Sequence, residues 1–120
     1  MNSGRFMEGY DMSVEICKYD RDWDNFYAKL VMNEVISSQR MYKKYLKSAM
    51  IELRIHYFQV NGEIRKCNLE AVMRELDLLI EWVENHAEGE DLEYLKSKLQ
   101  FMQKLIPENL QDDNDILHIL

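Results

Sequence analysis

Two pairs of acidic residues, each spaced one helical turn apart, come closest in this chain to the spacing of a metal site. Glu81 and Glu84 form one pair, and Glu88 and Asp91 form the other. Such pairs bind Mg²⁺ well when they face each other from separate helices, because carboxylate oxygens then surround the ion. Gly89 is expected to break the helix between the pairs, and the pairs are too close in sequence to lie on facing helices. We therefore predict no metal site and no metal cofactor.

The other residue types that perform catalysis lack partners at useful spacings. His56 lies within an apolar stripe, where a hydrogen-bonded core or interface histidine is the expected structure. The segment 84–95 has acceptors at alternate positions, as a calcium loop has, but its twelfth position is Leu95 in place of the required carboxylate. The sequence has no Gly-rich phosphate loop and no nucleophile elbow. We predict no catalytic residue and no cofactor, and we expect the protein to act by binding and not as an enzyme.

The composition is that of an ordinary globular protein inside the cell. The 120 residues are 47% hydrophobic and 31% charged, which suits one domain with its own core. Cys17 and Cys67 have neither metal-ligand nor disulfide-framework spacing, so free thiols in a reducing compartment are expected. No apolar run approaches the roughly 18 residues of a membrane span, and a signal-peptide pattern is absent. We expect a cytoplasmic protein with no membrane partner.

Charge is distributed unevenly along the chain. Residues 40–66 carry seven basic and two acidic groups, whereas residues 67–120 carry four basic and thirteen acidic groups. In one interpretation the basic segment lies beside its acidic neighbours within a single bundle. In the other it forms a face for nucleic acid, which makes a nucleic-acid-binding regulator the alternative function. The basic residues of this segment are Arg40, Lys43, Lys44, Lys47, Arg54, Arg65 and Lys66.

Apolar residues recur at helical spacing through most of the chain, which predicts an all-α fold, a three- to four-helix bundle with long helices. The acidic cluster at 20–24 is typical of a helix start, and the Ser37–Ser38 pair is the expected break before the next helix. Residues 13–19 fit either an edge strand or a packed arm. The expected helices occupy residues 20–38, 42–64, 69–88 and 90–107.

The Asn61–Gly62 dipeptide opposes the second of these helices. Asn-Gly is the strongest two-residue hairpin signal, and residues 51–57 alternate as a strand would. The alternation changes phase at Phe58, however, while the helical stripe continues through the dipeptide. The helix is therefore the preferred prediction, and an α+β fold with a hairpin at about residues 51–67 is the alternative.

Composition divides the chain into three parts. Residues 1–12 are expected to form a flexible N-terminus, and residues 13–107 a helical domain. Residues 108–120 form a tail that is first acidic and then apolar. This tail fits a last helical turn or an arm folded back on the bundle, or else a short docking peptide for another protein.

The last three expected helices each carry a second apolar stripe opposite the first. A surface helix needs one stripe, and a lone bundle of this size cannot bury both. Because exposed apolar patches mark interfaces, we expect a small acidic protein-interaction module. Its role would be regulatory or inhibitory, as in immunity proteins and antitoxins, and it would form a homo-oligomer, bind another protein, or do both. The predicted interface residues are Ile51, Ile55, Phe58, Leu78, Trp82, Tyr94, Phe101 and Leu105.

Overall fold

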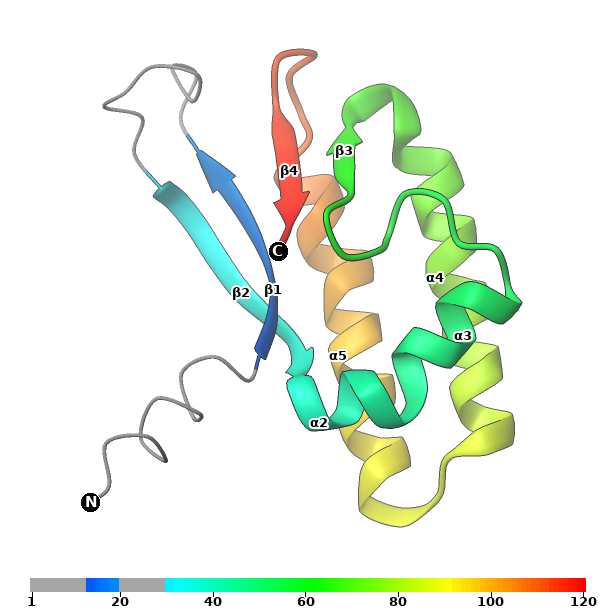
Figure 1. Ribbon diagram of the computed structural model, residues 1–120. Coiled ribbons are helices and arrows are strands. Elements are labelled where there is room, and N and C mark those ends of the chain that lie inside the picture. The colour runs from blue at the N-terminus through cyan, green and yellow to red at the C-terminus, as the bar shows by residue number, and fades with distance from the viewer. Residues whose placement is uncertain (1–12, 20–29) are drawn as a thin grey trace, which may run out of the picture.

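The chain folds into a four-stranded antiparallel sheet with helices packed against it, as seen in the computed structural model, which describes residues 13–19 and 30–120 (Figure 1). The strands are β1 (Ser13–Tyr19), β2 (Leu30–Ser38), β3 (Glu63–Arg65) and β4 (Ile116–Ile119). Their order across the sheet is β2-β1-β4-β3. The helical segments are α2 (Gln39–Met41), a π-helical stretch (Tyr42–Leu46), α3 (Lys47–Glu52), a 3-10 turn (Lys66–Asn68), α4 (Leu69–His86) and α5 (Gly89–Glu108).

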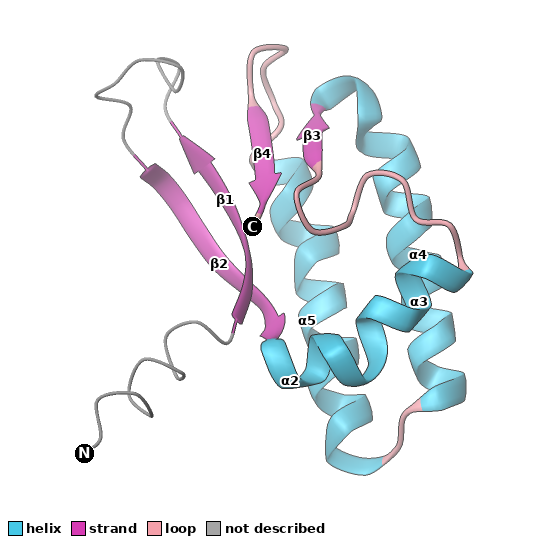
Figure 2. Ribbon diagram, in the orientation of Figure 1, coloured by secondary structure: helices cyan, strands magenta, loops and turns pink. Residues whose placement is uncertain are grey.

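Helices α4 and α5 lie side by side along the sheet, and the core fills the space between the two layers (Figure 2). The sequence predicted both helices with nearly the same ends, because each keeps a regular apolar stripe over its full length. Strands, helices and the loop after α3 contribute fully buried side chains to one continuous core, including Ile16, Ile36, Leu46, Phe58, Ile64, Leu76, Leu79, Leu95, Leu99, Met102 and Ile106.

The predicted all-α bundle is wrong, because both ends of the described chain form strands. The α+β alternative is closer, although its hairpin at 51–67 does not form. Strand β3 pairs with β4, more than fifty residues away, and Ile64 lies opposite Leu117. Residues 51 and 52 belong to α3, and the segment between α3 and β3 is a loop. The Asn-Gly signal thus marks a turn that joins a helix to a strand.

Strand β2 occupies part of the expected first helix, at residues 30–38. The rest of that expected helix, residues 20–29, and the expected flexible segment 1–12 lie outside the described residues. Two bulges interrupt the pairing of β2 with β1, where Val31 and Ile36 are the extra residues. Each bulge shifts the alternation by one position, so the strand lacks the two-residue period by which a sequence reveals a strand.

The expected helix at 42–64 ends early, at Glu52, through a C-terminal cap without glycine. The Ile55 N–H donates to the Met50 carbonyl at 2.9 Å, and the Arg54 N–H donates to the Ile51 carbonyl at 3.2 Å. These two bonds make a Schellman motif, with Arg54 in the left-handed region at φ 56°. Glycine normally occupies this position, and because arginine stands there, no residue pattern marks the end of the helix.

The loop that follows α3 ends in a tight turn at Asn61 and Gly62. Asn61 has a φ of 70°, and the Gly62 N–H donates to the Gln59 carbonyl at 2.8 Å. A Cβ atom on Gly62 would lie 2.3 Å from the Tyr57 carbonyl oxygen. Glycine is therefore required for the close approach of two backbone segments.

The C-terminal tail provides β4, an inner strand of the sheet between β1 and β3. Ile16 of β1 lies opposite Ile119, and Lys18 of β1 forms an ion pair with Asp115 just before β4 at 3.2 Å. The sequence of a strand buried on both faces is a short continuous apolar run. Its periodicity does not distinguish it from a helical turn. The structure therefore makes the tail part of the core layer.

Candidate functional site

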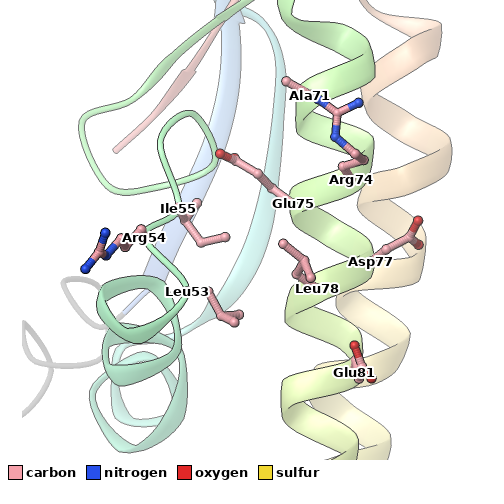
Figure 3. A pocket seen from close by; sticks show the side chains of 9 residues that line it. All are labelled: Leu53, Arg54, Ile55, Ala71, Arg74, Glu75, Asp77, Leu78 and Glu81. Carbon is pink, nitrogen blue, oxygen red and sulfur yellow. The ribbon is translucent and has the colours of Figure 1, made fainter.

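A groove of about 430 Å³ lies between α4 and the segment that follows α3 (Figure 3). We call it the α3–α4 groove. Its lining includes apolar, basic and acidic side chains from two stretches of the chain that are distant in sequence. The lining residues are Leu53, Arg54, Ile55, Ala71, Arg74, Glu75, Asp77, Leu78 and Glu81.

One face of α4 forms a complete wall of this groove. Ala71, Arg74, Leu78 and Glu81 recur at spacings of three and four residues, which places them along one side of the helix. From Ala71 to Glu81 the helix rises about 15 Å, which is close to three turns. The groove is therefore long enough to follow a short helix of another molecule.

The opposite wall is held in place by Glu75. Its Oε2 accepts the N–H of His56 at 2.6 Å, its Oε1 accepts the N–H of Phe58 at 2.9 Å, and the N–H of Tyr57 lies 3.1–3.2 Å from both oxygens. A carboxylate that accepts several backbone N–H groups makes strong, charge-assisted bonds. Glu75 thus fixes the loop after α3 to α4 and gives the groove a defined width.

The centre of the groove is apolar and its two ends have opposite charges. Leu53, Ile55 and Leu78 point into the space between the walls, with Arg74 toward one end and Glu81 toward the other (Figure 3). Leu78 is 44% exposed. Within the described part of the chain, neither Arg74 nor Glu81 has a side-chain hydrogen bond or ion pair. Both charged groups are therefore available to a bound molecule.

A second cavity, of about 310 Å³, adjoins the groove and shares Arg54 and Ile55 with it. We call it the Lys47–Arg54 hollow. The Arg54 guanidinium extends away from α4, as Figure 3 shows, and so belongs more to this hollow than to the groove. The lining residues are Tyr42, Lys47, Met50, Ile51, Arg54, Ile55, Gln59 and Val60.

The eight predicted interface residues divide between this region, the core and other surfaces. Ile51, which is 71% exposed, lines the hollow, and Leu78 lines the groove. Ile55 borders both cavities, but it is only 6% exposed and belongs to the core. Tyr94 is partly buried, and its hydroxyl accepts the Ser38 N–H at 3.0 Å. The remaining four are Phe58, Trp82 and Leu105, which are buried in the core, and Phe101, which is exposed on α5.

The seven basic residues of the alternative interface do not form one surface free of acidic groups. Three of them pair with carboxylates: Lys44 with Asp91 at 3.2 Å, Arg65 with Glu63 at 3.1 Å and Lys66 with Asp113 at 3.9 Å. Arg65 is the last residue of β3 and Lys66 the first of the 3-10 turn, so neither belongs to the helical stretch 39–52. The exposed residues Arg40, Lys43, Lys47 and Arg54 form no ion pair with any described residue.

Asp91, at the start of α5, accepts hydrogen bonds from two side chains of the π-helical stretch. The Tyr45 hydroxyl lies 2.9 Å away and the Lys44 ammonium 3.2 Å away. These bonds, that of Tyr45 first, lower the pKa of Asp91, and the bond to Asp91 raises the pKa of Lys44. Asp91 lines a third cavity of about 280 Å³, but Tyr45 and Lys44 already bond its carboxylate, so its role is to fasten α5 to the π-helical stretch.

The cysteines lie apart from these cavities. Cys17 is buried in β1, and burial raises the pKa of its thiol, while Cys67 is exposed in the 3-10 turn before α4. Among residues 13–19 and 30–120 no three His, Cys, Asp or Glu side chains are arranged to hold a metal ion. None of the described helices is long and apolar enough to cross a membrane.

Comparison of the chain with protein-family models, with curated proteins and with solved structures finds no match. The groove therefore has to be interpreted from its own chemistry. Sequence reasoning found Leu78 and Ile55 through their apolar spacing, but it missed Arg74, Glu75 and Glu81. Each of these is a charged residue of an amphipathic helix, and its role depends on a loop that the sequence did not predict.

Proposed function

We propose that the protein is a binding module that regulates or inhibits another protein, and that it docks an amphipathic helix of that protein in the α3–α4 groove. The observation that carries the proposal is the apolar centre of the groove, with exposed Leu78, between the unpaired charges of Arg74 and Glu81. Helix-in-groove recognition uses apolar anchors at successive turns of a helix, and charged rims set the partner's orientation. The protein acts through this contact and not through catalysis.

The positions of the two charges favour an antiparallel partner helix. Arg74 lies nearer the N-terminus of α4 and Glu81 nearer its C-terminus. An antiparallel helix would place its C-terminal end, which carries partial negative charge, near Arg74, and its N-terminal end near Glu81. Acidic side chains in the last turn of the partner and basic side chains in its first turn would strengthen the same pairing. An apolar side chain midway along the partner helix would contact Leu53, Ile55 and Leu78.

The test compares Leu78→Glu with Phe101→Glu. Both side chains are apolar and 44% exposed on long helices, so the two substitutions introduce the same charge at positions of equal fractional exposure. Each tagged variant and the wild type would be purified from the source cells, and the proteins that accompany them quantified by mass spectrometry. We expect a stoichiometric partner that Phe101→Glu retains and Leu78→Glu reduces at least about tenfold, since buried apolar anchors contribute more than 1–2 kcal/mol to binding.

A photo-crosslinking residue at position 78 provides the direct readout. A crosslink to the same partner, mapped to an amphipathic helical segment, would support docking in the groove. A crosslink only to a second copy of the chain, together with dimeric mass in light scattering, would replace the proposal with self-association. A partner that binds wild type and Leu78→Glu equally would show that the groove is not the binding surface.

A further inference from the structure

We propose that the Lys47–Arg54 hollow is a binding site for a small amphiphilic organic anion. Lys47 and Arg54 would hold the anionic head group, a carboxylate, phosphate or sulfate. The apolar body would lie against Met50, Ile51, Ile55 and Val60. This site does not depend on the docking of a partner helix in the adjoining groove, since neither Leu78 nor Arg74 lines the hollow.

The charge of the hollow selects for anions. Its lining contains two cationic side chains and no carboxylate, and Glu52, the acidic residue between Ile51 and Arg54, does not line it. Lys47 and Arg54 have no hydrogen bond or ion pair to any other described side chain. The groove beside it differs, because three carboxylates accompany two arginines there. Two unpaired cations that line the hollow together with apolar side chains match a ligand with a charged end and an apolar body.

The volume of the hollow and its construction suit a small molecule. Its volume of about 310 Å³ lies at the lower end of the range for small-molecule pockets, about 300–1,000 Å³. All of its lining comes from residues 42–60, which run from the π-helical stretch through α3 into the loop that follows. Glu75 fastens that loop at residues 56–58, just before Gln59 and Val60. The hollow therefore exists before any ligand binds.

The backbone at Arg54 is an independent reason to assign a role to its side chain. Arg54 occupies the left-handed C-terminal position of a Schellman motif, at φ 56°, where glycine is the favoured residue. A non-glycine residue in this conformation stores strain, and such strain occurs where the side chain serves a function. The motif also sets Ile55 against Met50, so the same turn positions the cation and part of the apolar wall.

Octanoate is a suitable probe because it has one carboxylate and one short apolar chain. Octanoate would be titrated into the full chain, below the concentration at which it forms micelles, and followed through backbone amide and methyl resonances. We expect saturable shifts centred on Met50, Ile51, Ile55 and Val60. Octanol and octylamine should bind at least about tenfold more weakly, because octanol lacks the negative charge and octylamine carries a positive charge that Lys47 and Arg54 repel. Octanol that binds as tightly as octanoate would overturn the proposal, as would shifts confined to other surfaces.

Two variants test the assigned residues, and a third is the control. Lys47→Gln and Arg54→Gly should each weaken octanoate binding about tenfold, while Lys43→Gln, which removes the same charge outside the hollow, should leave it nearly unchanged. Arg54→Gly should also stabilise the fold, so its loss of affinity cannot come from unfolding. Unchanged affinity in both hollow variants would overturn the proposal.

Two further probes separate the possible head groups and the need for an apolar body. Octyl phosphate and octyl sulfate compared with octanoate would show which anionic head group Lys47 and Arg54 prefer, and tight binding of any of the three supports the site. Inorganic phosphate should bind at least about tenfold more weakly than octyl phosphate, because it buries no apolar surface. Equal binding of the two would overturn the assignment of the apolar wall.

Discussion

Replacement of Glu75 by glutamine tests the connection between α4 and the loop that forms one wall of the groove. The glutamate oxygens accept the N–H groups of His56, Tyr57 and Phe58. Glutamine has nearly the same shape, but an NH2 group replaces one of the two carboxylate oxygens. This NH2 group is a donor and would face a backbone N–H. The negative charge that strengthens the remaining bonds is lost as well. The substitution therefore removes the bonding pattern without opening a cavity.

The expected loss of stability is about 2 kcal/mol. A hydrogen bond to a charged group contributes about 1.5–3 kcal/mol, and a donor left unpaired in the interior costs about 1–3 kcal/mol. The His56 bond is exposed, so water can replace the acceptor there, whereas the Phe58 bond is partly buried. Glutamine will place its NH2 group at the exposed end, which keeps the cost toward the lower part of the range.

Urea unfolding followed by circular dichroism measures this loss, and hydrogen exchange locates it. We expect faster exchange of the amides of residues 56–58 in Glu75→Gln, because the acceptor at the exposed end is lost and the bonds to the remaining oxygen lose their charge assistance. Glu93→Gln is the control, since Glu93 is exposed on α5 and should change stability by less than about 0.5 kcal/mol. A loss in Glu75→Gln no larger than that of the control, or unchanged exchange at 56–58, would refute the role of Glu75.

Three other changes test further parts of the structure. Arg54→Gly should raise the free energy of unfolding by about 0.5–1 kcal/mol in urea, because it relieves a left-handed backbone conformation; a destabilised variant would contradict this. Asp91→Asn should destabilise the protein at neutral pH, because the folded state lowers the pKa of Asp91. The difference from wild type should persist above the ordinary aspartate pKa of about 3.9 and vanish as the pH falls through the lower folded value; a pH-independent difference would argue against it. Deletion of residues 116–120 removes an inner strand and should abolish cooperative thermal unfolding. A truncated protein that still unfolds cooperatively would contradict the role of β4.

The sequence predicted those elements whose pattern is local and failed where a contact between distant segments decides the structure. Helices α4 and α5 bury one regular stripe, so their periodicity was sufficient. Strand β4 has only four residues, and it is a strand because β1 and β3 lie on either side of it. In β2, the bulges at Val31 and Ile36 removed the alternation that would have revealed the strand.

For a related reason, the sequence predicted only the apolar residues of the candidate site from their spacing. Apolar spacing identified Ile51, Ile55 and Leu78, but the groove they share exists because the helix ends at Glu52 and the chain turns back toward α4. That turn depends on Arg54 in a conformation that arginine rarely adopts and on a carboxylate of α4. Neither interaction has a signature in the local sequence. The sequence therefore singled out Arg54 only as part of a basic segment, and it did not assign Arg74 or Glu75 to a site.

The sheet explains much of the second apolar stripes in the sequence. Their burial limits the apolar surface that is left for the proposed partner. A bundle of helices alone could not have covered both faces, and the prediction of an interface started from that surplus. The loop after α3 carries Phe58 into the core, and Trp82 and Leu105 are buried as well. Among the described residues near the groove, the large apolar side chains that stay exposed are Leu78 and Ile51. One or two exposed apolar side chains suit the proposed partner, a single helix that these residues would anchor and that Arg74 and Glu81 would orient.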